Sequence, residues 1–330
     1  MKKALRIFIT LLFFLFSRAS ISQNLIDSTV NVDSIHSIIE ILASDSLQVR
    51  LTGTRENVKS AFFIAKKFQD IGLKQVSGLN GYFEKVDSIG YNVIGILKGK
   101  TKPNELIILS AHYDHIGTLK TNPYPFFRRD ESAEESDSIF NGANDNASGI
   151  SALIALAKHY SVENNNQRSI MFIAFTGEEL GTLGSKFSAK QVDKNAVVAM
   201  LNFDMIGRSY FNNYRPYITG SEHSNLRTIL NKNLYQFDSK KYGKSFIKID
   251  PFKEEKLFWR SDNAAFAGKG IPAHTIMATS PQDKFYHHLK DEIQTIDFKL
   301  IAEVVKTIII GAKTIIDGTD SPTRIFLRPR

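Results

Sequence analysis

Four short apolar runs recur along this chain and constrain its fold more than any other feature. The runs are ELIILSA, SIMFIAF, AVVAMLNF and IPAHTIM, which are rich in β-branched or aromatic residues. Runs of this length and composition are typical of strands buried on both faces of a parallel sheet. Segments with helical spacing lie between them, and the clearest, ENVKSAFFIAKKFQDIG, ends at Gly72. We therefore predict an α/β fold with a mostly parallel, mixed and twisted sheet that carries helices on both faces.

The remaining segments complete the expected element order. Residues 33–48 and about 296–316 are expected to form helices, and ASGISALIALAKHYS an amphipathic helix, while YFEKVDS and YNVIGILKG are expected to be strands. The acidic, aromatic segment 119–140 is too polar for a core, and we expect this loop and residues 209–258 to border the substrate site. Because no repeat or linker divides the chain, residues 23–318 are expected to form one domain, followed by a short tail over 319–330.

The N-terminus has the composition of a secretory signal peptide. Lys2, Lys3 and Arg6 precede the apolar stretch IFITLLFFLF, and the small residues of SRASIS follow it. A helix that crosses a membrane needs roughly 20 apolar residues, which this stretch does not provide. We expect residues 1–22 to be removed on export to the periplasm or the extracellular space, with a retained N-terminal anchor as the alternative. Once the signal is removed, no stable membrane insertion is expected.

Charge and cysteine content exclude several classes of protein. Removal of residues 1–22 takes away four basic residues and no acidic one, so the formal net charge falls from +8 to +4, with 38 Lys and Arg against 34 Asp and Glu. So mild a charge, without a long basic cluster, argues against a nucleic-acid partner. The chain has no cysteine, which excludes a disulfide scaffold.

Most residues of metal-binding type follow the apolar runs at the points where the strands should end, whereas Asp145 lies in a polar loop just ahead of a helix. They are, in chain order, His112 and Asp114 in AHYDH, Asp145 in NGANDNASG, Glu178 and Glu179 in TGEELG, Asp204 in DMIG, and His287 and His288 in YHH. Ligand sites in open α/β sheets form beyond the carboxyl ends of the strands, so we expect these side chains to meet at one edge. Imidazole and carboxylate without thiolate suit zinc in an open hydrolytic site, with manganese or cobalt as substitutes.

Each of these motifs has an ordinary structural explanation when it is taken alone. A His-x-Asp after a strand is more often incidental than a metal site, and a Glu-Glu pair is usually a solvated turn. An aspartate beside Asn and Gly usually forms a turn or a helix N-cap. Their order along the chain and their common position after strands together favour a metal site.

The chain resembles the di-zinc aminopeptidase family, whose superfamily also includes glutamate carboxypeptidases and glutaminyl cyclases. The matching segments run in the expected order from about residue 42 to residue 291: LASDSLQVRLTGT, AHYDH, NGANDNASG, FTGEELGTLGS, NFDMIG, SDNAAFAGKGIP and YHHLKD. The segment 81–105 has no room for the inserted domain of larger relatives, so the resemblance implies a compact single-domain member.

The resemblance implies a set of five metal ligands. Asp145 would bridge two zinc ions. His112 and Asp204 would complete the shell of one ion, and Glu179 and His287 that of the other. A carboxylate can use its two oxygens to hold two cations about 3.5–4 Å apart, as two-metal hydrolases require.

The resemblance also implies roles for residues that do not bind metal. Asp114 would orient His112 from behind, and Glu178 would be the general base toward a water that bridges the two ions. Tyr286 would either donate a hydrogen bond to the developing oxyanion or act as a packed aromatic. The peptide bond Asp145–Asn146 is expected to be cis, as it is among relatives.

Two positions depart from the family pattern, and one ligand assignment has an alternative. Asn263 stands where a histidine is frequent, and we expect altered substrate contacts there rather than a lost metal. Leu289 replaces a usual proline, and His288 is an alternative to His287 as the ligand, although alignment on the flanking residues favours His287. Three further histidines are expected to belong to packing or to the surface: His115, His159 and His274.

From these observations we predict an exported zinc-dependent exopeptidase, specifically an aminopeptidase that removes the N-terminal residue of a peptide substrate. One alternative is a glutaminyl-peptide cyclotransferase on the same scaffold, which uses one zinc and releases ammonia. The other is a catalytically inactive binding domain, which would be expected to lack Glu178 or a ligand. The intact ligand set favours two zinc ions and peptidase activity.

Overall fold

The computed structural model describes residues 23–121 and 138–326. The expected signal peptide and most of the acidic loop therefore lie outside the described residues. Among the helices that are described, none is both long and apolar enough to span a membrane.

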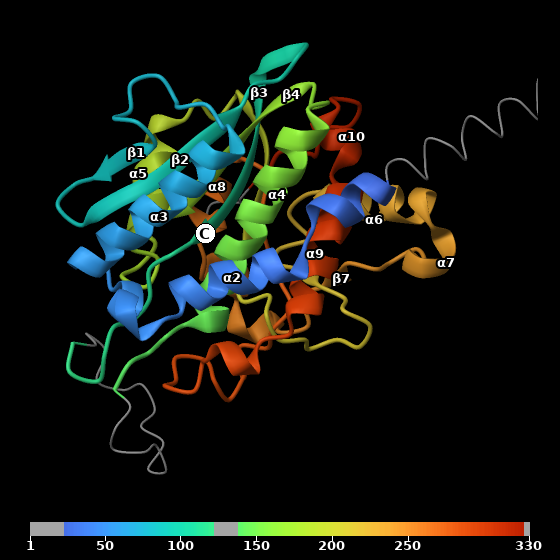
Figure 1. Ribbon diagram of the computed structural model, residues 1–330. Coiled ribbons are helices and arrows are strands. Elements are labelled where there is room, and N and C mark those ends of the chain that lie inside the picture. The colour runs from blue at the N-terminus through green and yellow to red at the C-terminus, as the bar shows by residue number, and fades with distance from the viewer. Residues whose placement is uncertain (1–22, 122–137, 327–330) are drawn as a thin grey trace, which may run out of the picture.

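A mixed sheet of eight strands forms the centre of the molecule (Figure 1), in the order β1-β2-β4-β3-β5-β8-β6-β7. Strands β4, β3, β5 and β8 are parallel, β2 is antiparallel to β4, and β6 is antiparallel to β8. The strands are β1 Phe83–Val86, β2 Gly90–Leu97, β3 Lys102–His112, β4 Arg168–Phe175, β5 Val197–Phe203, β6 Tyr217–Ile218, β7 Lys248–Ile249 and β8 Ala273–Met277. The expected mostly parallel, mixed sheet is confirmed.

Helices cover both faces of this sheet, as the sequence predicts. Helices α2, α3, α4 and α9 lie over one face, and α5 and α8 lie over the other (Figure 1). The helices are α2 Val32–Leu42, α3 Arg55–Ile71, α4 Gly149–Glu163, α5 Leu183–Gln191, α6 Leu226–Phe237, α7 Ser239–Tyr242, α8 Asn263–Ala267, α9 Phe298–Gly311 and α10 Lys313–Ile316. Helix α3 begins at the side-chain cap Thr54 and ends at Gly72, whose φ of 87° is one that glycine adopts readily.

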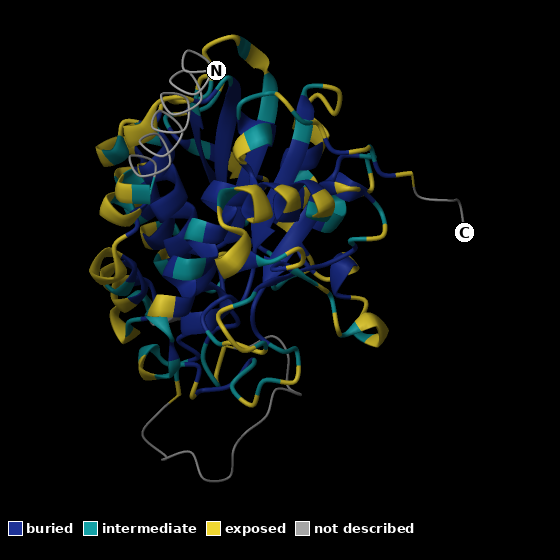
Figure 2. Ribbon diagram, turned by 90° about the vertical axis from the view of Figure 1, so that its right-hand side faces the viewer, coloured by how far each residue is buried: buried dark blue, intermediate teal, exposed yellow. Residues whose placement is uncertain are grey.

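The core consists of two apolar layers, one on each face of the sheet. Side chains alternate along a strand, so Ile107 and Leu109 of β3 pack with α4 while Ile108 between them joins the layer of α8. Every residue of β4 is buried. Figure 2 shows the buried residues concentrated in the sheet and the exposed residues on the outer turns of the helices. A strand covered on both faces can be mostly apolar, which explains the four runs in the sequence.

Three expected elements have different limits or surroundings. The helix predicted over residues 33–48 ends at Leu42, and a separate 3₁₀ turn, Asp45–Arg50, follows it. Helix α4 is buried on most sides rather than amphipathic, because it lies between the sheet and helices α2 and α9. The predicted final helix is divided at Ala312 into α9 and α10.

Candidate metal centre

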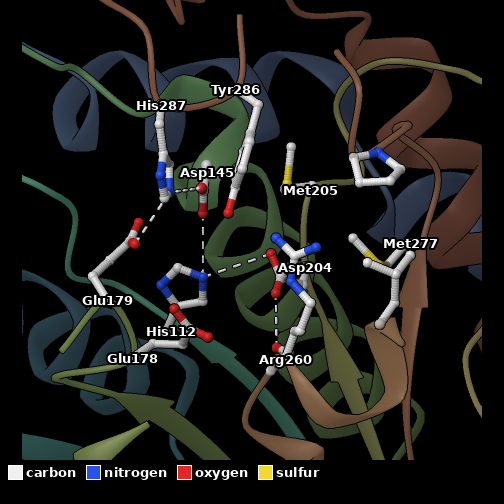
Figure 3. Close-up of a pocket in the computed structure, with 13 residues that line it drawn as sticks. His112, Asp145, Glu178, Glu179, Asp204, Met205, Arg260, Met277, Tyr286 and His287 are labelled. Carbon is white, nitrogen blue, oxygen red and sulfur yellow. Dashed lines mark hydrogen bonds and ion pairs between the residues drawn. The ribbon is translucent and has the colours of Figure 1, made fainter. Parts of the chain in front are cut away.

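The parallel strands bring the predicted ligands to one edge of the sheet. His112 is the last residue of β3, Glu178 and Glu179 follow β4, Asp204 directly follows β5, and His287 lies in the loop after β8. Figure 3 shows these side chains converging on one pocket with Asp145, which comes from the turn before α4. The expectation that the five proposed ligands converge is confirmed.

Asp145 lies between the two histidines and faces each with a different oxygen. Its Oδ1 is 3.3 Å from Nε2 of His112, and its Oδ2 is 3.1 Å from Nε2 of His287. Glu179 Oε2 lies 3.1 Å from the same nitrogen of His287, and Asp204 Oδ1 lies 3.6 Å from Nε2 of His112. The donor atoms thus form two groups that share Asp145, and the group of Glu179 and His287 also includes a nitrogen of His115.

The spacing of these donors fits zinc. Two donors bound to one tetrahedral zinc at about 2.0–2.2 Å lie roughly 3.4 Å from each other. The four separations between an imidazole nitrogen and a carboxylate oxygen, 3.1 to 3.6 Å, match this value. Each group therefore has room for one ion between its donors.

The turn that carries Asp145, Ala143–Ser148, is fixed by Asp291. The backbone N–H groups of Asn144 and Asp145 donate to the Asp291 carboxylate at 3.0 and 3.1 Å. Arg208 donates to the same carboxylate at 2.7 Å. The charge of Asp291 is therefore paired, although the Asp291 side chain is fully buried. The Asp145–Asn146 peptide bond is cis, as expected.

A buried arginine ties the end of β3 to the start of the same turn. Arg50 is completely buried and donates to the carbonyl oxygens of Tyr113, Asn141 and Gly142 at 2.7, 2.9 and 3.0 Å. Burial lowers the pKa of its guanidinium to about 10. Arg50 lies in the matched motif LASDSLQVRLTGT, but no role for it was predicted from the sequence.

Asp114 holds the two adjacent glutamates. Its carboxylate accepts from the backbone N–H groups of Glu178 and Glu179 at 3.1 and 3.2 Å and from the Thr52 hydroxyl at 2.9 Å. It also lies 3.7 Å from Nδ1 of His112, longer than a hydrogen bond, whereas the carbonyl oxygen of Asp114 lies 3.3 Å from that nitrogen. Asp114 therefore stands behind His112, as expected, and in addition fixes the turn that orients the glutamates.

The two other carboxylates of the donor set have partners that the sequence analysis missed. The Ser261 hydroxyl donates to Oδ2 of Asp204 at 2.7 Å. His115, which was expected in packing or on the surface, is fully buried with its Nδ1 2.9 Å from Oε1 of Glu179. This expectation was wrong because the chain beyond β3 turns His115 into the site, beside His287.

Burial and crowding shift the proton affinities of the cluster. Burial raises the pKa of Glu178 well above its usual range, and the neighbouring charge of Glu179 adds to the rise. Burial opposes a charge on His112, but Glu178 and the other carboxylates around it raise its pKa well above the ordinary value. Burial likewise raises the pKa of Asp262 to about 7. So many buried carboxylates favour a cation at this edge.

The pocket beside the donors has an apolar wall. It is lined by Met205, Leu257, Met277 and Pro281, with Arg260 at its side. Leu257 belongs to the segment 209–258 that was expected to border the site. The ring of Tyr286 stacks on His287 at a centroid distance of 3.9 Å, and its hydroxyl points into the site (Figure 3). Tyr286 is therefore both packed and placed to donate.

Two positions that the sequence left in question are resolved by their contacts. Nδ1 of His288 accepts from the backbone N–H of Lys290 at 3.0 Å, and among the described residues it is His287 that lines the pocket. Asn263 is fully buried; it donates to the carbonyl of Phe258 and accepts from Thr275. The fold thus uses the Asn263 side chain internally, and the altered substrate contacts expected at this position stay a prediction.

Comparison with known proteins identifies the family. The model of peptidase family M28 matches residues 92–310, more than half of the chain. The chain therefore belongs to peptidase family M28.

Individual relatives are similar over part of their length. Aminopeptidase YwaD of Bacillus subtilis is 28% identical over 216 residues, which cover 62% of this chain and 40% of that protein. A probable zinc metalloprotease of Pyricularia oryzae is 36% identical over 121 residues, 36% of this chain and 21% of that protein. This chain thus spans less than half the length of these two curated relatives.

Solved structures share the fold. The aminopeptidase from Aneurinibacillus sp. strain AM-1 aligns with a TM-score of 0.64 and 16% identity, covering 93% of this chain and 98% of that one. The Bacteroides thetaiotaomicron glutaminyl cyclase bound to N-acetylhistamine aligns with a TM-score of 0.65 and 20% identity, covering 88% and 98%.

Proposed function

We propose that this chain is an exported zinc-dependent exopeptidase that binds two zinc ions and acts as an aminopeptidase on peptide substrates. The observation that carries the proposal is Asp145, which directs one oxygen to the group of His112 and the other to the group of His287. A shared carboxylate between two imidazole–carboxylate groups is the arrangement that a two-metal hydrolase needs. Export rests on the composition of residues 1–22.

The ligands divide into two sets. His112, Asp204 and one oxygen of Asp145 would hold the first ion, and His287, Glu179 and the other oxygen of Asp145 would hold the second. Zinc, when bound, supplies Lewis acidity that lowers the pKa of water toward about 7 and polarises the carbonyl of the scissile bond.

Glu178 would act as the general base. Its side chain lies beside His112 (Figure 3) and belongs to neither donor group, so it is available to take up a proton. It would accept the proton of the attacking water and then deliver it to the leaving amine. Its raised pKa suits a carboxylate that both accepts and donates a proton.

Tyr286 and the apolar wall would position the substrate. Burial and then the charges of Asp145 and Glu179 raise the pKa of Tyr286 well above its usual value, so its hydroxyl stays protonated. It would donate to the oxygen on which negative charge develops. Met205, Leu257 and Met277 would accept an apolar side chain at the substrate's N-terminal residue.

A glutaminyl cyclase is the second candidate, since a glutaminyl cyclase shares this fold. On this scaffold that reaction uses one zinc and releases ammonia. The presence of both donor groups favours two ions and peptide hydrolysis.

A panel of amino-acid anilides, free peptides and N-terminally capped peptides, assayed with and without a chelator, tests the proposal. We expect chelator-sensitive release of free amino acids from uncapped substrates and about two zinc ions per chain. Ammonia release from N-terminal glutamine with a single zinc would instead identify the cyclase, and activity that survives the chelator would contradict both.

A further inference from the structure

Asp204 and Glu179 each belong to one donor group only, and each has a contact at both carboxylate oxygens. Asp204 faces His112 with Oδ1 and accepts from Ser261 with Oδ2. Glu179 faces His287 with Oε2, and its Oε1 lies 2.9 Å from His115 Nδ1. In both cases one oxygen is directed to the metal site and a buried protein group contacts the other.

The ring of His115 is held firmly in place. It is fully buried and packs edge-to-face against the ring of His287, with centroids 5.7 Å apart. On another side it meets Gly142, where an added Cβ would lie 2.6 Å from Cδ2 of His115. Gly142 also has a φ of 57°, so a larger residue is disfavoured there on two grounds. The turn of Asp145 is thus built to fit against this imidazole.

The contacts of His115 determine which nitrogen carries its proton. Within the described part of the chain Nε2 is buried without a hydrogen-bond partner, whereas Nδ1 faces the Glu179 carboxylate. A neutral imidazole has one N–H, and a buried N–H without an acceptor is costly. The proton therefore belongs on Nδ1, from which it is donated to Oε1.

We propose that His115 is a positioning residue that fixes Glu179 as a ligand through a single oxygen. By engaging Oε1 it leaves Oε2 directed to the ion shared with His287 and Asp145. The inference rests on the proposed function in that the ion is zinc. Groups that hold a metal ligand from behind typically contribute about 10–100-fold to metal affinity. Loss of His115 should therefore weaken binding of the ion in the Glu179 group and leave binding of the ion in the His112 group unchanged.

Zinc retention tests this role without relying on turnover. Purified full-length wild type, His115→Phe and His115→Asn are dialysed against graded concentrations of a chelator, and zinc per chain is measured by atomic absorption. Phe keeps the packed ring but has no donor, whereas the Asn amide can donate from nearly the position of Nδ1. His274→Phe replaces a buried histidine outside the cluster and serves as the control. Thermal melting of each metal-free variant checks that it is folded.

We expect His115→Phe to lose one of its two zinc ions at about 10–100-fold lower chelator concentration than wild type. His115→Asn and the His274→Phe control should retain both ions. Wild-type affinity in His115→Phe would overturn the proposal, and so would equal loss in the Asn and Phe variants, since that result would make His115 a direct ligand. Wild type that holds only one zinc would contradict the two-ion function, while the same comparison on that ion would still decide the role of His115.

Discussion

His112 and His274 are buried histidines on the same sheet, yet their surroundings differ completely. His112, at the end of β3, is surrounded by carboxylates, and although burial opposes its charge, Glu178 and its neighbours raise its pKa well above the usual value. His274, inside β8, faces the carbonyl of Thr219 and the hydroxyl of Ser224, and burial lowers its pKa to about 4. Burial alone therefore does not determine the state of a histidine in this fold.

The comparison separates two kinds of buried polarity. Inside β8, His274 is held neutral and contacts only the neutral groups of Thr219 and Ser224. At the carboxyl edge, acidic groups collect because several parallel strands end there. Buried charges of one sign are costly unless an opposite charge joins them. The edge is therefore built to be completed by cations, and the interior is not.

The largest expected effect comes from Glu178, the proposed general base. Glu178→Gln keeps the size of the side chain but cannot accept a proton, so kcat should fall by at least about 10²–10⁴-fold. Zinc content should stay near two per chain, as measured by atomic absorption alongside steady-state kinetics.

Glu179→Gln is the matched comparison for this variant. The Glu179→Gln variant should bind one of the two zinc ions more weakly, and added zinc should partly restore its activity. If Glu178→Gln loses metal while Glu179→Gln retains it, the roles of the two glutamates are reversed.

Metal removal should lower the free energy of unfolding, because the carboxylates at the edge of the sheet then lack the cations that balance their charge. Binding to the folded state alone stabilises by about 2.7 kcal/mol for each site when free ligand is 100 times its dissociation constant. Zinc should therefore raise the free energy of unfolding by about that amount per ion, as measured by urea denaturation with and without chelator. Equal stability of the metal-loaded and metal-free chains would contradict the idea that cations complete this edge.

His274 should make a smaller, pH-dependent contribution to the free energy of unfolding. The pKa of His274 is about 4 in the folded state, below its ordinary value of about 6.5, so as the pH falls the unfolded chain binds the extra proton first. Stability is then full above about pH 6.5 and falls with decreasing pH until about pH 4, by about 2 kcal/mol between pH 7 and pH 5. In chelator-treated protein, His274→Gln should show a shallower loss over this range in urea unfolding. An unchanged slope would mean that His274 is not held neutral.

The smallest effect is expected at the histidine next to the ligand. His288 binds the backbone of Lys290, so His288→Ala should keep turnover within a few-fold of wild type and retain both zinc ions. His287→Ala should instead resemble Glu179→Gln. A reversal of these two results would assign the ligand role to His288.

The sequence predicts that the donor residues converge, because the order of parallel strands translates position in the chain into position in space. The role of each donor as a ligand comes instead from the family resemblance. The sequence does not predict His115, whose partner Glu179 lies 64 residues away and is reached only through the path of the chain beyond β3. Strands β6 and β7 have two residues each, too few for a periodic pattern. The internal hydrogen bonds of Asn263 could not be predicted either, because its orientation depends on how α8 packs against β8, which the motif around it does not encode.

The anchoring of Asn144 and Asp145 by Asp291 has a consequence for biosynthesis. Asn144 and Asp291 are 147 positions apart, and His287 also lies near the later end of the chain. A growing chain that has already emerged with AHYDH and NGANDNASG cannot yet close the donor set around Asp145. Capture of the proposed metal would therefore follow nearly complete synthesis and folding, as it does where a site exists only in the folded state. The order in which the residues are made would thus delay the proposed activity until the whole fold is in place.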